Sequence, residues 1–209
     1  SQHLSDLLQN DWGVSQNRIF VAPIPVQITS IDHKSNKRKQ IVIVGRMHEE
    51  RGVLLSLDIA LKVLAKNPDV ALLLIGDGPL RSKVESIVNQ SGFRARISIL
   101  GKLPHSEVLK KLSESHVLLS SAPEEGFGLA IREAAYSGLF VVALRNSGTI
   151  EAERELAPIL NVFSTASEAV SMCELSLRSQ LSPSVVDRVI GIRKALNEES
   201  LRSIALSWL

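Results

Sequence analysis

The sequence contains almost no cysteine and no long apolar run. Cys173 is the only cysteine among the 209 residues, which excludes an intrachain disulfide and a cysteine-based metal cage. Its neighbours indicate a helix, so we expect Cys173 to be a buried apolar residue rather than a nucleophile. The longest apolar stretch is VALLLI at 70–75, which is too short to span a bilayer. The amino-terminal SQHLSDLLQNDWG also lacks the pattern of a secretion signal. We therefore expect a reducing, cytoplasmic compartment and leave association with the cytoplasmic face of a membrane open.

Several motifs of nucleotide and metal chemistry are missing as well. There is no GxxxxGK[ST] P-loop, and GDGPLR and GFGLAI each lack the third glycine of a dinucleotide fingerprint, which disfavours an NAD enzyme. No DxD occurs, so the usual metal bridge to a nucleotide diphosphate is absent, and we expect no metal and no cofactor. The five histidines do not pair at metal-ligand spacing. Two of them, His48 and His105, fall in predicted turns and are expected to be surface residues.

The charge is too evenly balanced for a dedicated nucleic-acid binder. The chain has 24 Lys and Arg against 22 Asp and Glu, which gives a net charge of +2. The one concentrated basic run, DHKSNKRKQ at 32–40, is typical of a solvated linker. No nucleic-acid partner is therefore predicted. The hydrophobic content of 44% and charge of 22% are ordinary for one large α/β domain or two small ones.

From residue 41 onward, short apolar runs alternate with stretches of helical periodicity. The runs are apolar at every position, which is typical of parallel strands covered by helices on both faces. They are IVIVG, VALLLI, ISILG, HVLLSS, GLFVVAL and a weaker PILNVF. We predict an α/β fold, a doubly wound parallel sheet of about six strands that is Rossmann-like, with a helical C-terminus. Its expected divisions are a linker or crossover segment at 1–39, the sheet domain at 40–180, and C-terminal helices packing on it at 181–209.

Three helix boundaries are predicted from local signals. Ser106 is the expected cap for the helix after the third strand, and a short helix is expected at 151–156. Ser182 followed by Pro183 marks the start of a helix. The segment NEESLRSIALSWL then forms either a last helix or a continuation after a kink.

The strand ends carry most of the residues that could bind a ligand. In parallel sheets of this kind ligands bind beyond the carboxyl ends of the strands, and the turns there are GRMHEERG, GDGP, GKLPHS, SSAPEEGFG and ALRNSG. The segment 126–130, GFGLA, would offer unpaired N–H groups of a helix start to an anion. The guanidinium groups of Arg46 and Arg51 could form bidentate hydrogen bonds to phosphate oxygens. Together they predict a diphosphate clamp, although Arg46 could instead cap a strand end and Arg51 could simply be solvated.

Carboxylates beside such a clamp would repel phosphate, so they are better suited to hydroxyl groups. Glu133 could bind the two hydroxyls of a ribose, and Glu125 could bind the hydroxyls of a sugar. Glu124 is interpreted as a solvated neighbour. The alternative for Glu125 and Glu133 is favourable electrostatics at a helix start combined with surface exposure. A ligand with both a diphosphate and many hydroxyls is a nucleotide sugar.

The ordered motifs VGR…RG, IGDGP, LG, EEGFGLAIREA and SGTIE resemble the donor-binding half of the retaining GT-B glycosyltransferases of family 4, or group 1. The resemblance covers about residues 1–151. The E-x7-E motif of that family matches Glu125 and Glu133, with GFG between them. It implies a glycosyltransferase that moves a hexose-type sugar from a UDP-, GDP- or ADP-sugar with retention of configuration and without a dedicated carboxylate nucleophile. Stabilisation of the leaving phosphate then contributes most of the catalysis.

The resemblance also implies a role for each matching residue. Arg46 would contact the donor diphosphate, the amides of 126–129 would face the sugar and phosphates, and Gly76 and 102–103 would lie near the base. The residues expected to be catalytic are Arg46, Arg51 and Glu125. Those expected to bind the donor are Gly45, Gly76, Lys102, Leu103, Gly126, Phe127, Gly128, Leu129 and Glu133.

The sequence departs from the family pattern at three places. Arg51 stands where the family usually has lysine, Ser147 stands where it often has glycine, and AERELAPILNV lacks the usual glycine turn. The family's amino-terminal domain, which holds the acceptor, has no counterpart here. We therefore expect an upstream acceptor-binding domain as partner and donor binding without efficient transfer by the chain alone.

Two alternatives stay open at this point. One is a non-catalytic nucleotide-sugar-binding or interaction module that lacks an acceptor domain. The other is a nucleotide-sugar epimerase of the same general fold, which is disfavoured because it should lack glutamates at this spacing.

Overall fold

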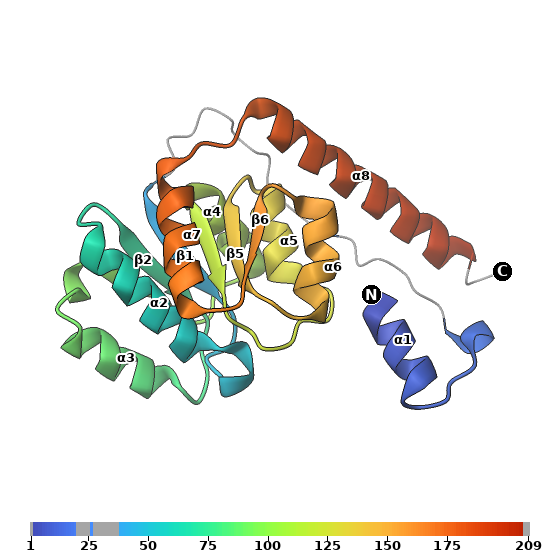
Figure 1. Ribbon diagram of the computed structural model, residues 1–209, viewed down its shortest axis with the longest axis horizontal. Coiled ribbons are helices and arrows are strands. Elements are labelled where there is room, and N and C mark those ends of the chain that lie inside the picture. Colours follow the sequence, from blue (N-terminus) through green and yellow to red (C-terminus); the bar gives the residue numbers. More distant parts are fainter. Residues whose placement is uncertain (1, 20–25, 27–37, 207–209) are drawn as a thin grey trace.

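The computed structural model describes residues 2–19, 26 and 38–206. Its centre is a six-stranded sheet in the order β3-β2-β1-β4-β5-β6, in which all neighbouring strands are parallel (Figure 1). The strands are β1 (Gln40–Val44), β2 (Ala71–Ile75), β3 (Ile97–Ile99), β4 (Val117–Ser120), β5 (Phe140–Leu144) and β6 (Leu160–Phe163). The predicted doubly wound sheet of about six strands is confirmed. The order reverses direction between β1 and β4, which places the expected ligand crevice at that point.

Helices cover both faces of the sheet (Figure 1). They are α2 (Val53–Lys66), α3 (Arg81–Gln90), α4 (His105–Glu114), α5 (Leu129–Tyr136), α6 (Ser147–Leu156), α7 (Ala166–Arg178) and α8 (Pro183–Leu206), whereas α1 (Gln2–Asn10) lies apart from the sheet (Figure 1). Buried residues of α2, α3 and α7 form one core with Ile41 and Ile43 of β1. Those of α4, α5, α6 and α8 form a second core with Val42 of the same strand. Alternate side chains of β1 therefore enter opposite layers, and this explains why residues 41–44 of the strand are all apolar.

Two predicted helix boundaries need correction, and the predicted helix start at Pro183 is confirmed. Helix α4 begins at His105 after Pro104, so Ser106 lies in its first turn and does not cap it. Helix α6 begins at Ser147 instead of residue 151, because Asn146 caps it in a reciprocal pair of hydrogen bonds with Thr149. Helix α8 runs without interruption over Pro183–Leu206, so the segment NEESLRSIAL continues the helix.

Other expectations are met in the interior. Cys173 is fully buried in α7, where desolvation raises the pKa of its thiol to about 12. A thiol in that state is not a nucleophile at neutral pH. Val26 contacts helix α8, where the Asn197 side chain accepts a hydrogen bond from the N–H of Val26 and donates one to its carbonyl oxygen.

The amino-terminal segment is described in part. Helix α1 lies within the predicted crossover segment, and of the basic run only residues 38–40 lie within the described part. There Lys39 pairs with Asp69 at 2.7 Å. The remainder of the run lies outside the described residues, and the division at residues 39 and 180 stays a prediction. Over the residues that the structure describes, we find no helix with the length and apolarity to cross a bilayer.

Candidate functional site

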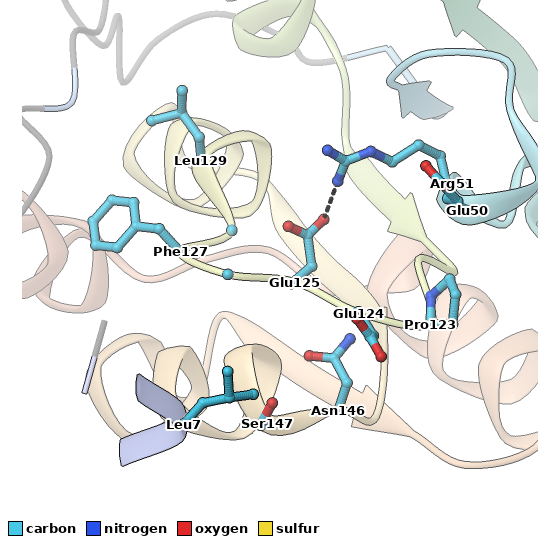
Figure 2. A pocket seen from close by; sticks show the side chains of 12 residues that line it. Leu7, Glu50, Arg51, Pro123, Glu124, Glu125, Phe127, Leu129, Asn146 and Ser147 are labelled. Carbon is cyan, nitrogen blue, oxygen red and sulfur yellow. Dashed lines mark ion pairs between the residues drawn. The ribbon is translucent and has the colours of Figure 1, made fainter. Parts of the chain in front are cut away.

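A cleft of about 1090 Å³ opens at the carboxyl edge of the sheet. Three strand-end loops contribute to its wall, those after β1, β4 and β5, together with one side chain of α1 (Figure 2). The lining residues are Leu7, Glu50, Arg51, Pro123, Glu124, Glu125, Gly126, Phe127, Gly128, Leu129, Asn146 and Ser147. Six of the predicted site residues are therefore brought together: Arg51, Glu125, Gly126, Phe127, Gly128 and Leu129.

The first turn of α5 faces this cleft without a side-chain cap. Gly128 is the N-cap residue and has a φ of 69°, a left-handed conformation that favours glycine. Its lack of a side chain means that no capping oxygen meets the first N–H groups of the helix. Leu129, the first helical residue, is 42% exposed. The helix start therefore retains unpaired donors and a partial positive charge, as an anion site requires.

Arg51 and Glu125 meet within the cleft. Arg51 Nη1 lies 3.6 Å from Glu125 Oε1, and the Glu125 side chain is only 14% exposed, whereas that of Arg51 is 41% exposed (Figure 2). Burial raises the pKa of the Glu125 carboxyl above its ordinary value, and the positive charge of Arg51 opposes part of that rise. A cation and a carboxylate thus lie side by side near a helix start in the cleft.

The loop after β5 supports Glu125. Asn146 donates from Nδ2 to the carbonyl oxygen of Ala122 at 3.0 Å, which ties this loop to the one after β4. Gly148 packs against the backbone of Glu125 so closely that no Cβ would fit. Ser147, noted as a departure from the family's glycine, is exposed at the cleft, and the position that requires glycine is its neighbour. Asn146 was missed among the residues predicted from the sequence, although the spacing Asn-x-x-Thr is a signal for a helix cap.

Arg132 is a second residue that was missed. It lies inside α5 between the paired glutamates and is buried, with 1% of its surface exposed. Its guanidinium donates from Nη1 to the carbonyl oxygen of Phe127, pairs with Glu155 of α6 at 2.9 Å, and stacks 4.0 Å from the Phe127 ring. One buried cation therefore ties the glycine loop to two helices. No local signal in the sequence identifies it, because its partner Glu155 lies 23 residues away.

Glu133 does not line the cleft. Its side chain is 6% exposed, and Oε1 lies 2.7 Å from Nε2 of His105, the first residue of α4. Burial raises the pKa of Glu133, and the hydrogen bond and charge of His105 oppose that rise. The prediction that His105 is a surface turn residue was incomplete, because the half-exposed ring is the hydrogen-bond partner of a buried carboxylate.

The other predicted residues follow the same sheet edge toward β3. The N–H of Gly76 donates to the carbonyl oxygen of Gly101 at 2.8 Å, and a Cβ on Gly76 would lie 1.9 Å from the carbonyl oxygen of Gly45. Arg46 and Lys102 are exposed, and Leu103 packs partly buried against the second core. None of Gly45, Arg46, Gly76, Lys102, Leu103 and Glu133 is among the residues that line the cleft. Their predicted contacts with a donor stay predictions.

Comparison with known proteins identifies relatives among the glycosyltransferases. The family model of the glycosyl transferases group 1 matches residues 27–169. A phosphatidylinositol N-acetylglucosaminyltransferase subunit from Arabidopsis thaliana is 30% identical over 143 residues, which are 66% of this chain and 32% of that protein. The human subunit of the same name, from Homo sapiens, is 32% identical over 127 residues, which are 61% of this chain and 26% of that protein. The chain therefore spans about a third or less of the length of these relatives.

Solved structures share the fold at low identity. A TarM mutant of S. aureus, solved with fondaparinux, α-GlcNAc-glycerol and UDP, superposes with a TM-score of 0.77 at 18% identity, covering 100% of this chain and 42% of that one. The C-terminal domain of the group 1 protein LpcC from Francisella tularensis gives a TM-score of 0.56 at 19% identity, covering 82% of this chain and 88% of that domain. The resemblance to GT-B enzymes seen in the motifs is confirmed, and the chain belongs to the group 1 glycosyl transferases.

Proposed function

We propose that this chain is the donor-binding half of a retaining glycosyltransferase, which holds a nucleotide sugar while a domain outside these 209 residues presents the acceptor. One observation carries the proposal. Arg51, Glu125 and the uncapped start of α5 line the same cleft at the carboxyl edge of a parallel sheet. This combination matches the two chemical halves of a nucleotide sugar.

Different residues of the cleft would bind different parts of the donor. The N–H groups at the start of α5 and the guanidinium of Arg51 would bind the diphosphate, where negative charge grows as the bond to the sugar breaks. Glu125 would accept hydrogen bonds from the hydroxyls of the transferred sugar. Because Glu125 pairs with Arg51, its carboxylate keeps a positive neighbour despite its burial. Arg46 is the proposed second contact to the diphosphate, reaching in from the exposed turn after β1.

The names of the relatives suggest which donor to test first. The relatives from Arabidopsis thaliana and Homo sapiens are N-acetylglucosaminyltransferase subunits, and TarM was solved with UDP and α-GlcNAc-glycerol. The 2-deoxystreptamine N-acetyl-D-glucosaminyltransferase of Niallia circulans is also similar, at 26% identity over 111 residues, 53% of this chain and 28% of that protein. UDP-N-acetylglucosamine is therefore the first candidate, and GDP- and ADP-sugars are the comparison.

Calorimetric titration of the chain tests the proposal. We expect UDP-N-acetylglucosamine to bind with a Kd of about 1 mM or tighter and to bind more tightly than UDP. Glu125→Gln should remove the added affinity of the sugar, and Arg51→Met should weaken UDP more than uridine. Glu124→Gln changes an exposed carboxylate on the same cleft and serves as the matched control, with affinities close to wild type. Failure of UDP, GDP, ADP and their sugars to bind at millimolar concentration would overturn the proposal.

Two further measurements separate the parts of the proposal. Donor binding is expected to survive EDTA, because the sequence has no DxD to hold a bridging metal. Loss of binding in EDTA would contradict that expectation and leave the cleft assignment intact. Binding without transfer by this chain, followed by transfer with retained anomeric configuration once the acceptor domain is supplied, is the expected result for an enzyme half. A chain that binds donor and never supports transfer would instead be the non-catalytic module.

A further inference from the structure

We infer that His105 is a positioning residue for the ribose of the donor, acting through Glu133. The inference rests on the proposed function and deepens it, because it names the residue that orients the carboxylate predicted to bind the ribose hydroxyls. It is carried by one contact between two helices. Nε2 of His105, at the start of α4, lies 2.7 Å from Oε1 of Glu133, which lies one turn into α5.

The buried carboxylate of Glu133 needs a hydrogen-bond donor. With 6% of the side chain exposed, most of its hydration is lost, and an ionised group without a partner in such a place is strongly disfavoured. Within the described part of the chain, His105 is the side chain that supplies a hydrogen bond to it. An ionised carboxylate only accepts hydrogen bonds, so Nε2 carries the proton in that state.

The hydrogen bond with His105 involves only one of the two carboxylate oxygens of Glu133. Oε1 is held by His105, and Oε2 has no hydrogen-bond partner among the described residues. A carboxylate fixed at one oxygen loses most of its rotational freedom, so its second oxygen presents lone pairs in a set direction. The His105 ring is itself half exposed, and its Nδ1 makes no hydrogen bond to the residues that the structure describes. The pair therefore leaves Oε2 of Glu133, held in a set direction by His105, to accept hydrogen bonds from ribose hydroxyls.

The position of the pair in the fold agrees with this role. Helix α4 follows β3, helix α5 follows β4, and both helices begin at the carboxyl edge of the sheet. The strand order reverses between β1 and β4, and α5 follows β4, so the pair lies at the sheet edge next to this point. Nucleotides bind at this point in doubly wound sheets. With a rise of about 1.5 Å per residue, Glu133 lies about 6 Å along the axis from the helix start that faces the cleft.

A purely structural contact between α4 and α5 would have a different consequence. It would change the free energy of unfolding, and any effect on nucleotide affinity would be the same whether or not the ligand has ribose hydroxyls. The positioning role instead predicts a change in the preference between two ligands that differ only in those hydroxyls.

The experiment compares UDP with 2′,3′-dideoxy-UDP by calorimetry, or the corresponding guanosine or adenosine pair if that base binds. Wild type should prefer the ribose ligand by about tenfold or more, the value of a lost charged hydrogen bond. His105→Ala should reduce this preference by about fivefold or more. His105→Gln, whose amide can donate from near the position of Nε2, should restore most of it. Ser106→Ala changes an exposed neighbour in the same turn and should leave the preference at the wild-type value.

Each result has a distinct meaning. If wild type binds none of the diphosphates, the proposed function fails. If it binds both ligands of the pair equally, the ribose role of Glu133 fails and the inference with it. If wild type discriminates and His105→Ala discriminates just as strongly, the donor site stands and the role of His105 is overturned. His105→Gln keeps the test decisive should His105→Ala fail to fold.

Discussion

The carbonyl oxygen of Glu125 occupies the space in which Gly148 would carry a side chain: a Cβ built on Gly148 would lie 2.0 Å from that oxygen and 3.1 Å from the Glu125 Cβ. Gly148 is the second residue of α6, which is tied to the preceding loop through the Asn146 cap. The backbone of the central carboxylate of the cleft therefore rests directly on a helix start. This contact links the SGTIE motif to the E-x7-E motif, although the two motifs lie on different helices.

The first prediction concerns Gly148→Ala. The added methyl group must displace the Glu125 backbone, so we expect a loss of about 1–3 kcal/mol in the free energy of unfolding. We also expect the sugar-dependent part of donor affinity to fall, because Glu125 moves. Chemical denaturation and calorimetry measure the two effects. Gly191→Ala in α8 is the control, since its Cβ would meet no atom within 4 Å and alanine favours a helix. A Gly148→Ala variant as stable as Gly191→Ala would refute the contact.

The second prediction concerns Gly52, which follows Arg51 and precedes the first residue of α2. It has a φ of 59°, and a Cβ there would lie 1.9 Å from the carbonyl oxygen of Ser121, just after β4. Gly52→Ala should therefore destabilise the chain by about 2–4 kcal/mol, from strain and overpacking together. It should also move Arg51 relative to Glu125 and weaken UDP binding, which denaturation and calorimetry would measure.

Gly92→Ala is the matched control for Gly52. Gly92 has a similar φ of 75° and no atom within 4 Å of a built Cβ. The substitution should cost only the backbone strain, about 1–2 kcal/mol. Equal losses at the two positions would show that the approach of Gly52 to Ser121 is not a tight one.

The sheet could be predicted from the sequence because its signals are local. Strands buried on both faces are apolar at every position, and the turns between them contain glycine, so the six strands were found in the right order along the chain. The convergence of Arg51, Glu125 and 126–129 followed from a general property, that the carboxyl ends of parallel strands meet at one edge. The start of α6 was predicted four residues too late because residues 147–149 are small or polar, and the capping signal of Asn146 lies just before them.

The supporting residues could not be predicted because their contacts are not local. Arg132 acts through Glu155, 23 residues away, and His105 acts through Glu133, 28 residues away. No periodicity in either segment encodes these distances, which depend on how α4, α5 and α6 pack over one face. The same reason explains the placement of Glu133. The motif spacing puts it in α5, whereas its burial against α4 depends on tertiary packing.

The third prediction concerns the buried cation Arg132. Glu155→Gln leaves a guanidinium with 2% of the side chain exposed and without its carboxylate, and we expect a loss of about 2–4 kcal/mol. Arg132→Met removes the buried charge itself. Because the remaining Glu155 side chain is 31% exposed and can be solvated, Arg132→Met should lose less free energy of unfolding than Glu155→Gln. Because Arg132 also holds the Phe127 carbonyl, Arg132→Met should still weaken UDP binding. Unfolding of the two single variants and the double variant measures the coupling. A larger loss for Arg132→Met than for Glu155→Gln would contradict this order.

The last prediction is a dependence on pH that follows from the raised pKa values of Glu125 and Glu133. Because burial is the main cause of both shifts, each carboxyl binds its proton more tightly in the folded chain than in the unfolded one. The stability that each carboxyl contributes is therefore fully present at pH values below 4.5, the ordinary pKa of a glutamate. It is lost as the pH rises through the higher pKa that the carboxyl has in the folded chain. Glu133→Gln and Glu125→Gln should accordingly be at least as stable as wild type at neutral pH, and this advantage should disappear at about pH 4.

Comparing each variant with wild type separates these two carboxyls from Asp77 and Glu168, whose pKa values are lowered and whose contribution to stability has the opposite dependence on pH. Donor affinity should change in the opposite direction to the stability, falling in acid because the protonated carboxyls of Glu125 and Glu133 lose acceptor oxygens. Unfolding and UDP-N-acetylglucosamine titrations across this pH range measure both effects. A Glu133→Gln variant that is less stable than wild type at neutral pH would show that the His105 contact outweighs the cost of burying the carboxylate.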